Sequence, residues 1–179
     1  PRFSLPGWMA LLAACLLWWC AASPALAHSS SNSFLALSAR DGALVLRADV
    51  HLRDLDLQFD LDRDRNGEVT WAEVAERQGE LQAWLTAGIT LTAGGTACAL
   101  APVDVLASQR SDGTYLSAEW TLPDCARALD AGQGPLSLRY GLICAQDSLH
   151  RALLRVDTPA LQTSAMLSPE QPEAQLQAR

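Results

Sequence analysis

Side chains that carry oxygen alternate with other residues in the stretch LDRDRNGEVTWAE, which runs from Leu61 to Glu73. Counted from Asp62, they occupy positions 1, 3, 5, 7, 9 and 12 of a twelve-residue window. These residues are Asp62, Asp64, Asn66, Glu68, Thr70 and Glu73. Hard cations prefer oxygen ligands, and a site without sulfur or imidazole disfavours zinc and copper. The chemistry that this stretch could perform is the binding of Ca²⁺.

The spacing matches the calcium-binding loop of the EF-hand at each diagnostic position. Gly67 at position 6 can adopt the positive φ at which the chain reverses. In such a loop Glu68 offers its backbone carbonyl, Thr70 acts through a water molecule, and Glu73 supplies two oxygens. The alternative is a solvated acidic turn, because Asp, Asn and Gly all favour turns. The glycine, the apolar Val69 at position 8 and the final glutamate together favour the calcium loop.

The segment after the loop has the apolar spacing of an amphipathic helix. Apolar residues recur at helical intervals between Trp71 and Leu85, with charged residues between them, and Gly88 stands where a helix stop is expected. We predict a helix over residues 71–86 and a short helix in RDLDLQFDL before the loop.

The sequence contains one loop with the EF-hand spacing, whereas sensor EF-hands work in pairs. A structural calcium site is therefore favoured over a switch.

Polar and apolar residues alternate through most of the remaining chain, as they do in half-buried strands. In ALVLRADVHL one face is wholly apolar: Leu44, Leu46, Ala48, Val50 and Leu52. An Asp41-Gly42 turn should pair this strand with SFLALS. Further strands are predicted in TYLSAEWTL, PLSLRYGLI, RALLRVDT and TSAML, and two more around the Gly94-Gly95 turn. We therefore predict a mainly β protein: an antiparallel, Ig-like β-sandwich with the EF-hand-like helix–loop–helix as an insertion.

The first 27 residues have the composition of a targeting segment. A single charge, Arg2, precedes an apolar run from Trp8 to Ala22, and Pro24-Ala25-Leu26-Ala27 then forms a small-x-small cleavage pattern. This pattern predicts a secretory signal peptide at 1–27, cleaved after Ala27. Two alternatives stay open. The segment could be a transmembrane anchor, or the protein could be a lipoprotein whose lipid is attached to Cys15.

Removal of residues 1–27 leaves 12 of the 13 arginines and all 20 acidic residues, a formal charge of −8. So acidic a surface disfavours nucleic acid as a partner. Nothing after Ala27 is long and apolar enough to cross a bilayer. We expect an exported domain at 28–168, periplasmic or extracellular, with membrane association as an alternative. A polar tail or linker is expected at 169–179.

Three cysteines, Cys98, Cys125 and Cys144, follow the predicted cleavage point, and export would place them where disulfides persist. We predict a disulfide between Cys98 and Cys125, which flank the middle of the domain. It would close a loop of about 28 residues and stabilise the fold by about 3 kcal/mol in the chain-entropy model. Cys144, beside Ile143 on a predicted strand, is expected to be a buried thiol. A pairing that involves Cys144 stays open.

A second binding hypothesis uses nitrogen instead of oxygen ligands. Cleavage after Ala27 would make His28 the first residue, and an α-amine next to an imidazole can chelate copper or nickel. His51 or His150 would then add nitrogen ligands, as in a periplasmic metal carrier. The simpler interpretation of this end is a flexible terminus.

Signals for catalysis are weak throughout the chain. The sequence lacks the serine-hydrolase, zinc-protease and phosphate-loop motifs. Cys144, Asp147 and His150 are close in sequence, but no pattern places them in contact. We therefore predict that the protein is not an enzyme; a hydrolase would need a clustered polar pocket.

Four features occur together: AHSSSNSFLALS, RDLDLQFDLDRDRNGEVTWAEV, the pair Cys98 and Cys125, and LHRALLRV. Over most of residues 27–168 they resemble the exported N-terminal region that precedes the membrane domain in some bacterial HupE/UreJ-family proteins. That family is associated with nickel uptake for hydrogenase and urease. The resemblance implies a membrane transport domain or a membrane protein as the partner. Because the multi-helix domain that would carry transport is not among these 179 residues, transport is not assigned to them.

Overall fold

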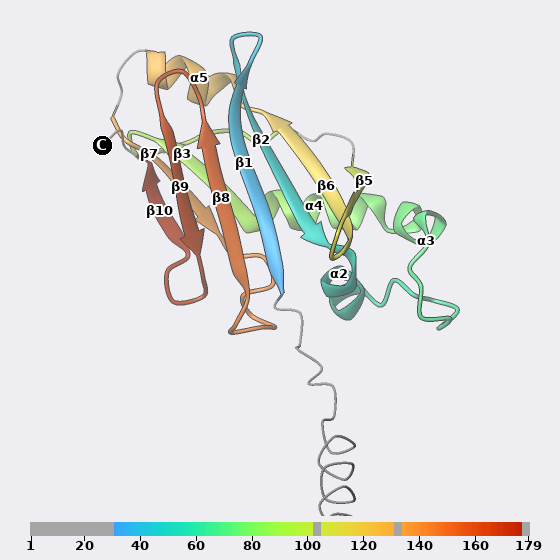
Figure 1. Cartoon of the computed structure of the whole chain (residues 1–179). Coiled ribbons are helices and arrows are strands. Elements are labelled where there is room, and N and C mark those ends of the chain that lie inside the picture. The colour runs from blue at the N-terminus through green and yellow to red at the C-terminus, as the bar shows by residue number, and fades with distance from the viewer. Residues whose placement is uncertain (1–30, 102–104, 131–133, 177–179) are drawn as a thin grey trace, which may run out of the picture.

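Residues 31–101, 105–130 and 134–176 are described by the computed structural model of the protein. The predicted signal peptide and His28 lie outside these ranges. Within them the chain forms two β-sheets and four helices, and Figure 1 shows the larger sheet in front of the smaller one. The protein is thus mainly β, and the prediction of this class is confirmed.

The larger sheet has six strands in the order β5-β6-β2-β1-β8-β9. Its strands are β1 (Asn32–Arg40), β2 (Ala43–His51), β5 (Val105–Arg110), β6 (Gly113–Thr121), β8 (Arg151–Asp157) and β9 (Gln162–Leu167). β1 and β8 run parallel, and the other neighbours are antiparallel. The smaller sheet is antiparallel in the order β10-β7-β3-β4. Its strands are β3 (Ile89–Ala93), β4 (Thr96–Ala97), β7 (Leu136–Tyr140) and β10 (Glu173–Leu176).

The predicted hairpin between β1 and β2 is confirmed. Ser33 pairs with Val50 at its open end and Arg40 with Ala43 beside the turn. Both turn residues have positive φ, 50° at Asp41 and 76° at Gly42. A two-residue turn of this kind has the twist that antiparallel strands need, which is why Asp-Gly is favoured there.

One cluster of buried apolar side chains joins the two sheets and the helices. Leu37 and Leu46 from the larger sheet and Leu91 and Leu138 from the smaller sheet are all fully buried. Every second residue of these strands enters the core, as the period of a strand requires. Helix side chains complete the cluster: Leu55, Val74, Leu81 and Leu85. Burial of so many aliphatic side chains is the main source of stability for such a fold.

The helices are α2 (Leu52–Phe59), α3 (Trp71–Glu76), α4 (Gln78–Gly88) and α5 (Pro123–Asp130). The short helix predicted before the loop is α2. The single helix predicted over 71–86 is wrong: it is divided at Arg77, whose backbone leaves the helical region (φ −108°, ψ 8°). Gly79, a poor helix former, lies two residues beyond the break. Helix α4 then runs on to Gly88, past the predicted end.

Strand β2 is more buried than the predicted half-exposed strand. Its apolar face enters the core, but Val45 and Asp49 on the opposite face are only 5% and 3% exposed. β2 is central in the sheet, between β1 and β6. Long side chains of the neighbouring strands therefore cover its outer face as well.

The unpacked tail predicted at 169–179 is wrong for the part that the structure describes. Residues Glu173–Leu176 form β10, which pairs antiparallel with β7 and lies at the edge of the smaller sheet. Leu176 is 4% exposed and belongs to the core. Ala174 and Leu176 alternate with polar residues, and two such positions suffice for a short edge strand.

Candidate metal site

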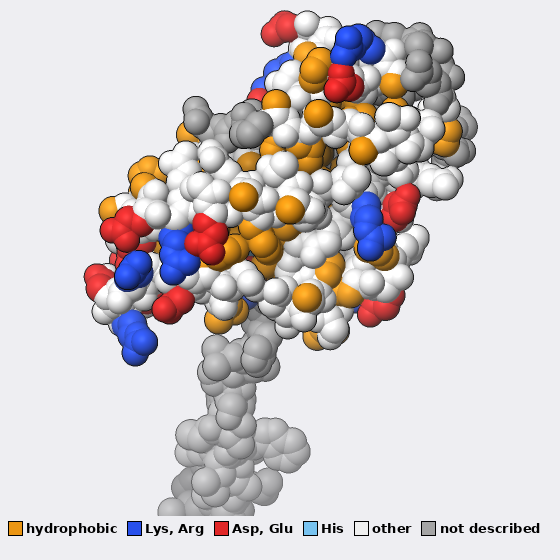
Figure 2. Space-filling model, turned by 180° about the vertical axis from the view of Figure 1, so that it is seen from behind, with side chains coloured by type: hydrophobic (Ala, Val, Ile, Leu, Met, Phe, Trp, Pro, Cys, Tyr) orange, Lys and Arg blue, Asp and Glu red, His pale blue; other side chains and the backbone are white. Residues whose placement is uncertain are grey.

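The predicted calcium loop connects two helices at one end of the molecule. Helix α2 ends at Phe59, Asp60 follows in the left-handed conformation with φ 51°, and α3 begins at Trp71. Figure 1 shows this connection projecting beyond the sheets, and Figure 2 shows acidic and arginine side chains gathered at the same end. The loop is therefore accessible to ions from solvent.

Three carboxylates converge within this loop. One ligand atom from each of Asp62, Asp64 and Glu73 lies within 4.8 Å of the other two. Among the described residues, these three form the group of acidic, histidine or cysteine side chains with metal-ligand spacing. Positions 1, 3 and 12 of the predicted loop are thus brought together, although Glu73 lies on a different element from the two aspartates.

Backbone N–H groups hold the two aspartates in place. Gly67 N donates to Asp62 Oδ2 at 2.8 Å. Asn66 N lies 3.0 Å from Asp62 Oδ1 and 3.1 Å from Asp64 Oδ1. Gly67 makes this reversal with φ 87°, and a Cβ there would meet nothing within 4 Å. Glycine is therefore required by the backbone conformation rather than by lack of space.

Glu73 is held by the start of its own helix. Thr70 caps α3, and its backbone N–H and hydroxyl both donate to Glu73 Oε2 at 2.8 Å, while Arg63 N donates to Oε1 at 2.9 Å. This reciprocal capping box satisfies helix N–H groups that would otherwise lack partners. The Thr70 backbone N–H, followed by its hydroxyl and then the Arg63 N–H, lowers the pKa of Glu73 below its ordinary value. The third carboxylate is thus ionised at neutral pH.

The other three predicted ligand residues, Asn66, Glu68 and Thr70, do not belong to the group of converging carboxylates. Asn66 Oδ1 accepts the Glu68 N–H at 2.8 Å, and the Asn66 side-chain amide donates to Asp64 Oδ2 at 2.9 Å. The Glu68 side chain is exposed and is not part of the carboxylate group. This agrees with a role for its backbone carbonyl alone. The Thr70 hydroxyl, expected to act through water, caps α3.

The charges and lone pairs of the loop suit a hard cation. Three carboxylates this close repel one another unless a cation lies between them. A carboxylate offers about four lone-pair positions, whereas Asp62 accepts two loop N–H groups, from Asn66 and Gly67. Oxygens thus remain available for a metal. Arg63 is directed to Glu76 on α3, at 3.9 Å, rather than to the three carboxylates.

Two features of the site were missed in the sequence. Asp56 Oδ1, on α2, accepts the N–H of Asp62 at 2.8 Å and so fixes the first predicted ligand residue to the preceding helix. The capping role of Thr70 was also missed, although its signal, a threonine three residues before a glutamate, is present in TWAE.

Two histidines of the nitrogen-ligand hypothesis, His51 and His150, do not belong to this carboxylate group. His51 Nδ1 accepts the Arg53 N–H at 3.1 Å and caps α2. His150 is fully buried, with Nδ1 2.5 Å from Ser31 Oγ and Nε2 2.9 Å from the Tyr140 hydroxyl. Both ring nitrogens of His150 are therefore engaged within the fold. His28 lies outside the described residues.

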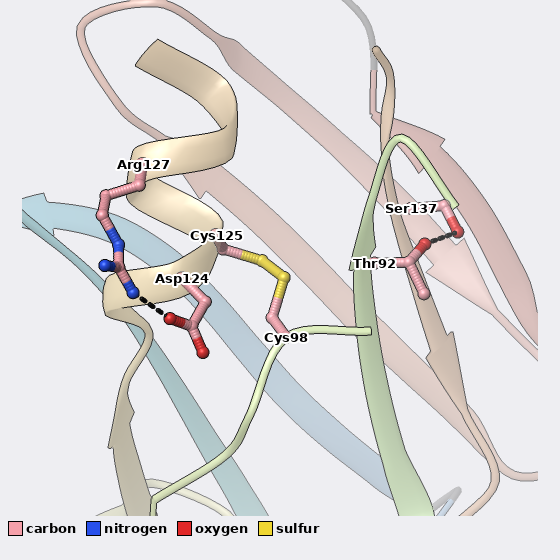
Figure 3. Close-up of a disulfide and its surroundings, with 6 residues drawn as sticks. All are labelled: Thr92, Cys98, Asp124, Cys125, Arg127 and Ser137. Atoms are coloured by element: carbon pink, nitrogen blue, oxygen red, sulfur yellow. Dashed lines mark hydrogen bonds and ion pairs between the residues drawn. A yellow bond between two sulfur atoms is a disulfide. The ribbon is translucent and has the colours of Figure 1, made fainter. Parts of the chain in front are cut away.

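The predicted disulfide is confirmed. Cys98 and Cys125 are bonded, with their Cα atoms 5.5 Å apart, and Figure 3 shows the bond running from the segment after β4 to helix α5. Beside it, Arg127 forms an ion pair with Asp124 on the same helix. The open alternative, a pairing with Cys144, is excluded, since Cys144 is the free cysteine of the described residues.

Cys144 does not have the environment predicted for it. It lies in a turn rather than on a strand, and it is partly exposed instead of buried. Partial burial raises the pKa of its thiol above the ordinary value. The thiol is thus held in its less reactive, protonated form.

Comparison with protein-family models and with curated proteins found no match for the chain. None of the helices among the described residues has the length and apolarity needed to span a membrane.

Proposed function

We propose that the protein binds one Ca²⁺ ion through an EF-hand-like loop, with Asp62, Asp64 and Glu73 as charged ligands. The observation that carries this proposal is the convergence of these carboxylates within 4.8 Å, at positions 1, 3 and 12 of a twelve-residue spacing. Asn66 and the backbone carbonyl of Glu68 would complete the oxygen shell. Thr70, at position 9, would contribute through a water molecule while it caps α3.

The role that we propose for the ion is structural. The loop is joined to α2 through Asp56 and to α3 through Glu73. An ion bound by residues from both ends of the loop would fix these helices relative to each other. A single loop has no second EF-hand with which to move, and the twofold role of Glu73 as cap and ligand favours a fixed geometry.

We further propose that the domain is an exported, Ig-like β-sandwich that acts as the extracytoplasmic part of a metal-uptake membrane protein. The Cys98–Cys125 disulfide supports an oxidising compartment. The pairing of two mainly antiparallel sheets around one core supports the sandwich. The resemblance to the exported region of HupE/UreJ-family proteins gives the proposed setting.

Calorimetric titration of the purified protein with CaCl₂ tests the binding proposal. We expect one ion per chain, and an affinity at least about tenfold weaker for Glu73→Gln, which removes the charge and one strong ligand oxygen but keeps the shape. Glu68→Gln is the matched control, because it removes the same charge from a residue whose side chain lies outside the group. Equal isotherms for wild type and Glu73→Gln would contradict the proposal.

A further inference from the structure

A groove of about 620 Å³ crosses the outer face of the larger sheet. Leu35 and Leu154 enter the core and are 2% exposed each. The alternation of a strand therefore turns their neighbours Phe34, Ala36 and Leu153 to the opposite face, where the groove lies. Residues of five strands line it, and none of them belongs to the calcium loop. Its volume is that of a site for a small molecule.

Strand register places a small residue between two arginines on the floor of this groove. Ala36 on β1 is opposite Arg47 on β2 and opposite Arg155 on β8. Since adjacent strands are about 4.8 Å apart, the backbones of the two arginines are separated by about 10 Å. The methyl group of Ala36 leaves the space between the two long side chains open.

The next row of the sheet forms an apolar strip. Phe34 is opposite Leu153, and Leu153 is opposite Met166 on β9. Leu153 and Met166 are 40% and 58% exposed, which is high for side chains of this kind. The groove thus has a cationic part around Ala36 and an apolar part directly beside it.

A buried carboxylate fixes two of the arginines that line the groove. Asp49 forms ion pairs with Arg47, at 2.8 Å, and with Arg110, which also lies 4.2 Å above the Phe34 ring. Burial alone would raise the pKa of Asp49, but hydrogen bonds from Ser117 and both arginines lower it below the ordinary value. The third arginine of the lining, Arg155, is paired with Asp157 two residues along the same strand. Three guanidinium groups thus stand against two carboxylates, which leaves one positive charge in excess at this face of a protein of net charge −7.

We propose that this groove binds a small organic anion with one carboxylate and an apolar body, such as a medium-chain carboxylic acid. The carboxylate would lie above Ala36, between Arg47 and Arg155. Arg47 donates through Nε and Nη2 to Asp49, Ser108 and Ser117, so its Nη1 would be the group that reaches the ligand. Arg155 would donate to the ligand as well as to Asp157, through charge-assisted hydrogen bonds. The apolar body would cover Phe34, Leu153 and Met166. Preformed ion pairs reduce the cost of ordering the arginines when the ligand binds.

Titration of the purified protein with octanoate, followed by amide chemical shifts, tests this assignment. We expect saturable binding with shifts in β1 and β8, and much weaker binding of 1-octanol, which lacks the charge. Arg155→Ala should weaken octanoate binding by roughly three- to fivefold, the range for an exposed charge. Arg127→Ala on α5 is the matched control: both side chains are 77% exposed, and both are paired with one aspartate.

Ala36→Leu gives a second test, because it fills the floor of the groove without changing the charge. It should abolish saturation, while far-UV circular dichroism shows that the fold is retained. Equal binding of octanol and octanoate, equal effects of Arg155→Ala and Arg127→Ala, or no saturable binding would each overturn the assignment. Tighter binding of an apolar tripeptide with a free carboxylate would also overturn it, in favour of docking of a chain terminus.

Discussion

His150 lies in a buried polar network that connects the two sheets. Its ring contacts the Ser31 hydroxyl on one side and the Tyr140 hydroxyl on the other, and the Tyr140 hydroxyl also lies 2.7 Å from Ser33 Oγ on β1. Burial lowers the pKa of His150 below 6.5, Arg151 lowers it further, and the charges of Asp54 and Asp147 oppose this shift. The imidazole is therefore neutral in the folded protein at neutral pH.

The lowered pKa of His150 predicts a loss of stability in mild acid. The unfolded chain, with an ordinary pKa near 6.5, binds the proton more readily than the folded one. Stability is therefore complete above pH 6.5 and falls as the pH drops below that value towards the folded pKa. Urea unfolding between pH 7.5 and about pH 5 measures this slope. His150→Gln should reduce this slope, because it removes the group that titrates; an unchanged slope in His150→Gln would refute this account.

At the scale of elements, the Cys98–Cys125 bond joins α5 to the segment after β4. The two residues are 27 positions apart, and closing such a loop restricts the unfolded chain. The double variant Cys98→Ser, Cys125→Ser should lose about 3 kcal/mol of unfolding free energy, measured in urea. Cys144→Ser, which replaces the free thiol, should change it by less than about 0.5 kcal/mol. If the double variant had the same unfolding free energy as the wild type, the disulfide would have no stabilising role.

Strand β10 provides a second prediction at this scale. Leu176 is almost fully buried at the edge of the smaller sheet, and its removal leaves a cavity beside β7. Leu176→Ala should therefore destabilise the protein by about 2 kcal/mol or more in urea unfolding. Gln175→Ala, at an exposed position of the same strand, serves as the comparison. Equal stability of the two variants would mean that β10 is not part of the folded core.

The strands that the sequence predicted are those with clear alternation or a strong turn signal. The β1–β2 hairpin followed from period two and from Asp41-Gly42. β10 was missed because four residues carry too little periodicity. Helix α5 was missed although Pro123 and Asp124 are typical of a helix start. The parallel pairing of β1 with β8 depends on contacts between residues more than 100 positions apart, which no local pattern contains.

The candidate calcium site was more predictable than the groove, for a physical reason. Loop ligands are close in sequence, so their spacing alone places Asp62, Asp64 and Glu73 together. The supporting contact from Asp56 could not be read from this spacing, because it depends on how α2 ends. The groove depends on the register of separate strands around Ala36, and strand register is not encoded in any one segment.

At the scale of the whole molecule, two segments outside the β core are fixed by a cross-link, one observed and one proposed: helix α5, and the loop between α2 and α3. The disulfide fixes α5 to the smaller sheet, and the proposed ion would fix α2 to α3 at the projecting end. The loop contributes Val69 to the edge of the core, so its order and the packing of the domain are coupled. Calcium binding should therefore stabilise the folded protein, because the unfolded chain lacks the site.

The most direct test of this account is urea unfolding of the protein at controlled free Ca²⁺ concentrations, from excess chelator to 10 mM. Above the dissociation constant, the unfolding free energy should rise by about 1.4 kcal/mol for each tenfold increase in free Ca²⁺, as one ion bound only to the folded state requires. Glu73→Gln should lose this dependence, and Glu68→Gln should keep it. An unfolding free energy that stays constant from chelator to 10 mM Ca²⁺ would contradict the central claim, which is that this loop binds Ca²⁺ and thereby stabilises the fold.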